Sequence, residues 1–120
     1  MTRKIVTISP EETVEKAVEI MMENDFECLP VTKEKTLLGI ITFRDIVSKV
    51  VYGRKDATKT RTRDIMSERL ITCHSDTTVL EVAKLMKSKR VRRVPVVDRS
   101  KRLVGLVTTF DLAMFGWGSE

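Results

Sequence analysis

Hydrophobic positions recur along the chain in a fixed order, and the whole order occurs twice. Each half has a short apolar run, a stretch with apolar residues at helical spacing, two further apolar runs and a second helical stretch. Setting Met66 against Met1 aligns Thr78 with Thr13 and Pro95 with Pro30, with one extra residue in the second copy. An internal match of this length predicts two copies of one structural unit.

Each copy is predicted to form a β-α-β-β-α unit. Residues 14–23 have apolar side chains at i, i+3, i+4 and i+7, which indicates an amphipathic helix, and residues 79–86 repeat the pattern. Strands are expected at residues 5–8, 29–31 and 37–42, and at 70–73, 94–97 and 103–108. The prolines predict a strand start or edge, and the run around Gly39 predicts a strand buried on both faces. Final helices are expected to start near Asp45 and Asp111.

The segment 52–63 has no apolar periodicity and five basic residues, so it is predicted to be a linker between repeats 1–51 and 64–120. A solvated loop and an anion clamp both fit its charge. Residues 64–66 are expected to strengthen the opening strand of the second repeat. One repeat buries too little apolar surface to be stable alone. We therefore predict an α+β fold in which two pseudosymmetric repeats pack sheet to sheet and form paired clefts.

Composition restricts the class of protein. Of the 120 residues, 42% are hydrophobic and 32% are charged, as in soluble globular proteins. The sequence has no apolar run near the roughly 20 residues that span a bilayer, and no apolar segment typical of a signal peptide follows Met1. A cytoplasmic protein without membrane association is therefore expected. The net charge of +5 favours an anionic partner, which is a nucleotide phosphate, an acidic protein or nucleic acid.

Residues suited to catalysis or metal binding are sparse. Cys28, Cys73 and His74 match no metal-ligand spacing, and either a disulfide or two idle thiols fits the cysteines. The sequence also has no base–nucleophile pair and no phosphate loop of the P-loop type. We therefore expect no catalytic residues, no metal, no required cofactor and no nucleotide hydrolysis, so the protein is predicted not to be an enzyme.

The pattern Gly-h-h-Thr-x-x-Asp, where h is apolar, occurs in both halves and ends in Thr42 and Asp45 or in Thr108 and Asp111. It lies where a strand is predicted to give way to a helix, and a helix N-terminus favours phosphate. A threonine hydroxyl can donate to a phosphate oxygen, and a carboxylate can accept from a ribose diol. The same spacing is also a capping arrangement that needs no ligand. Both interpretations fit the residues.

These features together resemble a tandem pair of CBS domains, the family named after cystathionine β-synthase. The resemblance rests on the opening runs Val6-Thr7 and Ile71-Thr72, the helices, the hydrophobic-Pro-Val runs and the Gly-h-h-Thr-x-x-Asp pattern, and it covers nearly the whole chain. It implies a regulatory module with two clefts that bind AMP, ADP or ATP, or alternatively S-adenosylmethionine or NAD. It also implies assembly into a flat homodimer.

The resemblance adds further candidate ligand-binding residues. In the family the residue before the aspartate faces the cleft, and here it is Arg44 or Phe110. Arg93 matches a basic position that reaches phosphate, whereas the first copy has Glu27-Cys28 there; a solvated helix end explains the run 87–93 equally. Adenine is expected to lie on backbone and apolar groups, and the candidates are Thr7, Ser9, Pro30, Thr72 and Pro95. The second cleft is thus expected to bind phosphate better.

Two functions follow as hypotheses. The first is a module that senses adenine nucleotides between its repeats and transmits binding to a separate, unknown effector protein. The alternative is a nucleic-acid-binding or protein-interaction module that uses the basic linker and the second repeat. A homodimer is expected in either case, with Trp117 near the interface because exposed aromatic tails often mark interfaces.

Overall fold

The computed structural model of the protein describes residues 5–115, and they fall into two compact units. One unit is Val6–Leu70, and the other consists of Ile5 and residues 71–115 among those described. Each unit combines helices with a two-stranded antiparallel sheet, so the predicted α+β class is confirmed. The sheet-to-sheet packing of the two repeats and the homodimer remain predictions. Trp117, which is expected near the dimer interface, lies outside the described residues.

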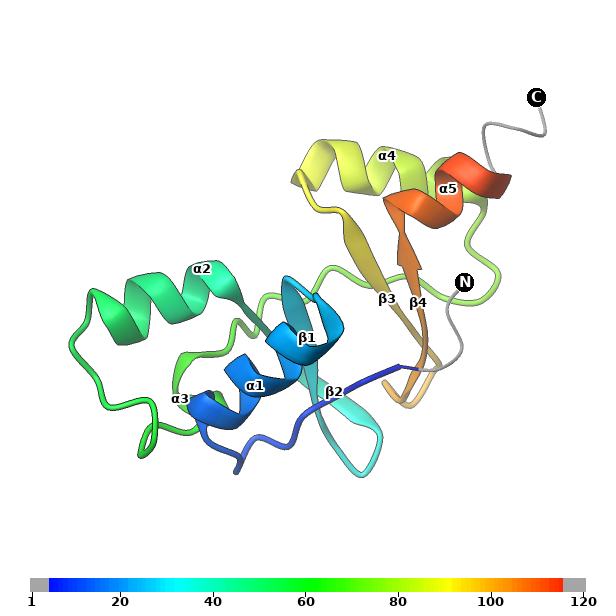
Figure 1. Ribbon diagram of the computed structural model, residues 1–120. Coiled ribbons are helices and arrows are strands. Elements are labelled where there is room, and N and C mark those ends of the chain that lie inside the picture. Colours follow the sequence, from blue (N-terminus) through cyan, green and yellow to red (C-terminus); the bar gives the residue numbers. More distant parts are fainter. Residues whose placement is uncertain (1–4, 116–120) are drawn as a thin grey trace. The chain divides into compact units, whose positions relative to one another are not determined.

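The first unit contains one hairpin and four helical segments (Figure 1). Helix α1 (Val14–Asn24) precedes β1 (Cys28–Lys33), which pairs with β2 (Thr36–Thr42). A short α2 (Phe43–Asp45) continues as the π-helix η1 (Ile46–Val51), and α3 (Thr62–Ile65) ends the set. In the π-helical part the backbone N–H of Tyr52 reaches the carbonyl of Val47, five residues back, at 2.8 Å. The sequence analysis did not predict this π-helix.

The second unit repeats the order without the π-helix. Helix α4 (Val79–Lys89) precedes β3 (Arg93–Val97), which pairs with β4 (Leu103–Thr108), and α5 (Thr109–Phe115) follows. Both final helices begin two residues earlier than predicted, because Thr42 caps α2 and the Thr109 that follows Thr108 is already helical. The aspartates therefore lie in the first helical turn instead of before it.

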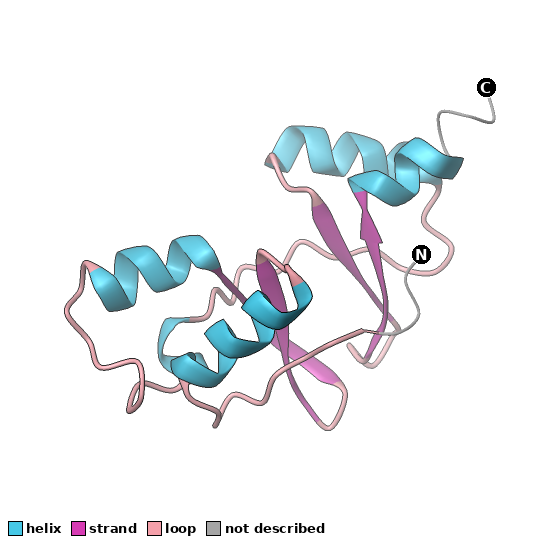
Figure 2. Cartoon of the chain, in the orientation of Figure 1, coloured by secondary structure: helices cyan, strands magenta, loops and turns pink. Residues whose placement is uncertain are grey.

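The two predicted opening strands are reduced to single bridges, and Figure 2 shows the segments before α1 and α4 as loops. Ile8 pairs with Val31 and Cys73 with Val96, both in parallel. The N–H of Ile8 donates to the carbonyl of Pro30 at 3.0 Å, and that of Cys73 donates to Pro95 at 3.0 Å. Pairing stops there because the chain turns at once, through Ser9-Pro10 or through residues 74–77.

Both prolines are accommodated by this arrangement. A residue in a strand points its N–H and C=O toward the same side. The Pro30 carbonyl faces Ile8, so the proline nitrogen also faces that side and the β1–β2 ladder loses no donor. The same argument holds for Pro95, whose carbonyl faces Cys73. Each proline is the third residue of its strand, so the expected strand start is wrong, but the missing donor does face away from the partner strand.

Helix caps follow the sequence closely. Thr78 and Glu81 form the predicted reciprocal capping box at α4, whereas Thr13 only accepts from the N–H of Lys16 at α1, as its half-pattern predicts. Both helices end in a left-handed residue, Asp25 or Arg90, where glycine is commoner. The two halves therefore share local backbone geometry as well as element order.

Each unit has its own apolar core. In the first unit one face of α1 packs with β1, β2 and η1, and its buried residues include Val14, Met21, Leu29 and Ile41. Strand β2 alternates between buried and half-buried positions, so the expected burial on both faces is wrong. A smaller core in the second unit includes Cys73, Val82, Met86, Val94, Val96 and Leu112.

The segment after η1 folds onto the first unit, not the second. The N–H groups of Val14 and Glu15 donate to the carbonyls of Thr60 and Ala57, and the buried Thr62 donates its hydroxyl to the carbonyl of Ser9 at 2.7 Å. Ile65 is buried in the first core. The expectation that residues 64–66 strengthen the second repeat's opening strand is therefore wrong, because Ile65 finds its apolar partners in the first repeat.

Gly39 is required by this docking. Ser67 and Ile40 exchange two backbone hydrogen bonds at 3.0 and 2.8 Å, which brings the chain across β2. A Cβ atom at position 39 would lie 2.7 Å from Sδ of Met66 and 2.8 Å from the backbone oxygen of Ser67. The glycine of the first motif copy therefore permits a close backbone approach.

We predict that Gly39→Ala lowers the free energy of unfolding by about 1–3 kcal/mol, because the new methyl group overpacks the crossing. Urea denaturation followed by circular dichroism measures the change. Adding Met66→Ala to this variant should not restore stability, since the Ser67 carbonyl is backbone and stays in place. A Gly39→Ala protein as stable as wild type would contradict the crossing.

Candidate functional site

The two Thr-x-x-Asp motifs adopt the same hydrogen-bonded geometry at a strand–helix junction. In the first, Oδ2 of Asp45 accepts from the N–H and the hydroxyl of Thr42 at 3.0 and 2.9 Å, and the Asp45 N–H donates back to the hydroxyl at 3.1 Å. The corresponding distances for Asp111 and Thr108 are 2.8, 3.1 and 3.2 Å. Each hydroxyl is thus occupied as donor and acceptor, which confirms the capping interpretation at both positions.

The remaining carboxylate oxygens differ between the copies. Oδ1 of Asp45 lies 3.3 Å from Nζ of Lys49, one turn later in the helix. Within the part of the chain that the structure describes, Oδ1 of Asp111 has no ion pair or hydrogen bond. A cap uses one oxygen of each aspartate, and among the described residues the other oxygen is paired with a cation at Asp45 but not at Asp111.

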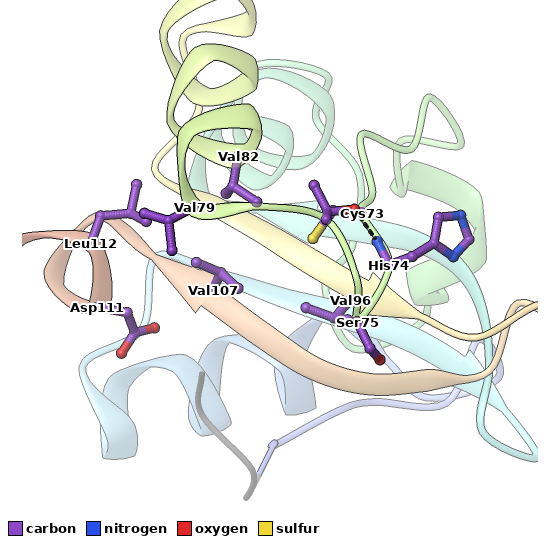
Figure 3. A pocket seen from close by; sticks show the side chains of 10 residues that line it. Cys73, His74, Ser75, Val79, Val82, Val96, Val107, Asp111 and Leu112 are labelled. Carbon is purple, nitrogen blue, oxygen red and sulfur yellow. Dashed lines mark hydrogen bonds between the residues drawn. The ribbon is translucent and has the colours of Figure 1, made fainter. Parts of the chain in front are cut away.

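A cavity of about 260 Å³ opens beside Asp111 inside the second unit. Its walls are mostly apolar and come from four elements: Val79 and Val82 of α4, Val96 of β3, Val107 of β4 and Leu112 of α5. Figure 3 shows these side chains gathered between the start of α4 and the hairpin, with the Asp111 carboxylate at one end. Cys73, His74, Ser75 and Thr77 complete the lining.

The cavity includes Asp111 but not the other predicted residues of the second repeat. Thr108 lies behind Asp111 as its cap partner, and Arg93 lies opposite Thr108 in the hairpin register, so these three are brought together. Thr72 and Pro95 each precede a lining residue, Cys73 or Val96. Phe110 is 70% exposed and does not line the cavity.

The predicted residues of the first repeat lie in equivalent positions. Thr7 and the buried Pro30 flank the Ile8 bridge. The hydroxyl of Ser9 accepts from the N–H of Glu11 at 3.2 Å, and its carbonyl accepts from Thr62, so this residue shapes the turn before α1. Arg44 is exposed on α2.

Sequence reasoning missed most of the cavity wall. Successive side chains of an extended segment alternate in direction, so the Cys73 side chain enters the cavity instead of that of Thr72. The same shift of one residue replaces Pro95 by Val96. The sequence pattern places Val79 and Val82 only on the apolar face of a predicted helix. Their position in the first turns of that helix was the available signal for the cavity wall.

Two polar lining residues have defined chemistry. Burial raises the pKa of the Cys73 thiol, so this group is protonated and unreactive near neutral pH. Nδ1 of His74 lies 3.1 Å from the carbonyl of Val97, which can only accept, so Nδ1 carries the proton and donates. The ring points away from the valines in Figure 3, consistent with the expected wall or surface position.

Metal and membrane sites are lacking among the residues that the structure describes. No three His, Cys, Asp or Glu side chains there come together as metal ligands. None of the helices in residues 5–115 is long and apolar enough to cross a bilayer. Cys28 and Cys73 are not joined by a disulfide.

Comparison with known proteins gives consistent results over nearly the whole chain. A sequence model described as CBS domain matches residues 1–52 and 63–117. The chain is 31% identical over 120 residues to the CBS domain-containing protein YhcV of Bacillus subtilis, covering 100% of this chain and 84% of that protein. It is 40% identical over 111 residues to the uncharacterized protein MK0525 of Methanopyrus kandleri, covering 92% of this chain but only 57% of that relative.

Solved structures show the same likeness. The CBS domain pair of protein MJ0100, in complex with 5′-methylthioadenosine and S-adenosyl-L-methionine, is 30% identical with a TM-score of 0.77. The match covers 98% of this chain and 93% of that chain. The repeated β-β-α order, the two capped Thr-x-x-Asp motifs and these matches establish that the chain belongs to the CBS domain family and carries two CBS repeats.

Proposed function

We propose that this CBS pair is a regulatory module that binds an adenine nucleotide, AMP, ADP or ATP, in the second repeat. The observation that carries the proposal is Asp111, which lines one end of an apolar cavity (Figure 3) and whose Oδ1 has no partner among the described residues. A ribose diol supplies hydroxyl donors for that oxygen, and the valine walls suit the faces of a purine. The adenosine ligands of the MJ0100 domain pair, which is similar in sequence and fold, support the same ligand class.

The cavity size fits part of a nucleotide. Pockets for drug-sized ligands measure about 300–1,000 Å³, so 260 Å³ suits a nucleoside with its phosphates outside. Arg93, across the hairpin from Thr108, is the proposed side-chain partner of the phosphate.

The proposed role is sensing without catalysis. In the polar lining, Nδ1 of His74 is hydrogen-bonded to the Val97 carbonyl, and burial raises the pKa of the Cys73 thiol, which favours its protonated form. Ligand binding changes a partner protein only if the ligand binds one conformation of the module more tightly than another. We place the transmitted change in α4 and α5, because both contribute to the cavity and would close on a bound nucleoside.

The structure gives less support to the nucleic-acid alternative. Two of the five linker cations are engaged inside the first unit: Arg61 donates to the carbonyl of Glu11 at 2.8 Å, and Arg63 pairs with the Glu11 carboxylate at 2.7 Å. An anion clamp needs these side chains to face a ligand instead. The linker is therefore better explained as a docked segment of the first repeat.

We predict that AMP, ADP or ATP binds the wild-type chain below millimolar Kd in isothermal titration calorimetry. Asp111→Ala should weaken binding by at least about tenfold, since a hydrogen bond to a charged group contributes about 1.5–3 kcal/mol. Glu81→Ala is the matched control, because it also removes the third-residue acid of a capping box, at the start of α4, without touching the cavity lining. Absence of binding by all three nucleotides, or equal weakening by both substitutions, would refute the proposal.

We also predict that a bound nucleotide protects Cys73 from alkylation. In a Cys28→Ser background, iodoacetamide should react slowly with Cys73 because the thiol is 4% exposed and burial raises its pKa. Saturating nucleotide should slow the reaction further, and the Asp111→Ala variant should lose this protection. Mass spectrometry follows the reaction. If a nucleotide binds and the alkylation rate does not change, the ligand lies outside this cavity.

A further inference from the structure

We propose that Lys49 acts as a built-in cation that holds Asp45 and so withholds the first repeat's aspartate from a ligand. The inference rests on the proposed nucleotide function and adds a specificity-determining residue to it. It follows that the two repeats bind unequally even though their Thr-x-x-Asp motifs are geometrically alike.

Both oxygens of Asp45 have a partner within the first unit. Oδ2 accepts two hydrogen bonds from Thr42, and Oδ1 lies 3.3 Å from Nζ of Lys49. The side chain of Asp45 is only 15% exposed, against 45% for Lys49. The ammonium group thus lies against Oδ1, the carboxylate oxygen that the cap leaves unused.

Lys49 is also held from the other direction. Its Nζ donates a hydrogen bond of 2.8 Å to the carbonyl of Ile65, and Ile65 is the last residue of α3. A free carbonyl at a helix C-terminus carries partial negative charge and favours a cation. Lys49 therefore bridges two acceptors, and a ligand hydroxyl must displace it from Asp45 without any gain at Ile65.

The backbone explains why a lysine can bridge here. Residues 46–51 form the π-helix η1, and Lys49 follows Asp45 by four positions, so its ammonium lies over the carboxylate. The docked α3 brings its carbonyl end to the same place, because Ile65 is buried in the first core. The π-helix η1 and the docked helix α3 both belong to the first unit.

Among the described residues of the second repeat, no cation is paired with Asp111 as Lys49 is with Asp45. Four residues after Asp111 the sequence has Phe115, which carries no charge. Helix α5 is an ordinary α-helix, and within the described residues the Asp111 carboxylate contacts only its cap partner Thr108. The two repeats thus differ in the side chain four residues after the aspartate of their shared motif.

The first arm of the test needs no nucleotide. Trace acetylation followed by mass spectrometry should show Lys49 reacting more slowly than Lys16, a lysine of the same unit that has only a surface pair with Glu19 at 3.5 Å. Asp45→Asn should raise the reactivity of Lys49 and leave that of Lys16 unchanged. Equal reactivity of the two lysines in wild type would overturn the proposed hold on Asp45.

The second arm is nucleotide stoichiometry by calorimetry. Wild type, Lys49→Arg and the control Lys16→Met should bind one nucleotide per chain, and Lys49→Met should gain a second site that Asp45→Ala removes again. Lys49→Arg changes the same side chain but retains the positive charge, so it separates the loss of the cation from a general effect of substitution at this position. An unchanged single site in a folded Lys49→Met protein, or loss of wild-type binding on that substitution, would overturn the inference.

The two arms separate this inference from the nucleotide proposal. If Lys49 is protected but wild type binds no nucleotide, the nucleotide proposal fails and the ion pair stands as a structural clamp; the inferred control of ligand binding fails with it. If wild type binds through Asp111 and Lys49→Met adds no site, the nucleotide proposal survives and only the role of Lys49 is refuted.

Discussion

The reciprocal hydrogen bonding between a strand-ending threonine and an aspartate in the next helical turn is the constraint on which both units depend. It fixes the direction in which α2 and α5 leave their hairpins, because the threonine backbone and hydroxyl both hold one carboxylate oxygen. A helix start built in this way also leaves the second oxygen out of the cap. The same residue can therefore serve the fold and a ligand, and the two roles do not compete.

What surrounds that second oxygen distinguishes the repeats. At Asp45 it meets Lys49, which the docked α3 also holds, whereas at Asp111 it meets an apolar cavity. Conservation of the cap geometry explains why the repeat is visible in the sequence. Divergence just outside the cap allows one copy to be structural and the other to bind, in the account we propose.

Local rules predicted much of this fold from the sequence. The Thr78–Glu81 capping box, the half-box at Thr13 and the hairpins around Pro30 and Pro95 depend on neighbours within a few residues. Long-range choices were not predictable in this way. Ile65 could have joined either repeat, and contacts distant in the sequence decide it, among them the hydrogen bond from Thr62 to Ser9 and the close approach at Gly39. The cavity wall was misplaced by one residue because the opening segments pair at a single position, which sets whether Thr72 or Cys73 faces inward.

A crystal structure of the protein with bound AMP tests the central claim most directly. The account predicts the adenosine between Val79, Val82 and Val96, with a ribose hydroxyl within hydrogen-bonding distance of Oδ1 of Asp111, and the Lys49–Asp45 pair unchanged. A nucleotide whose ribose is bound by Asp45 with Lys49 displaced, or one that leaves the Asp111 cavity empty, would contradict it.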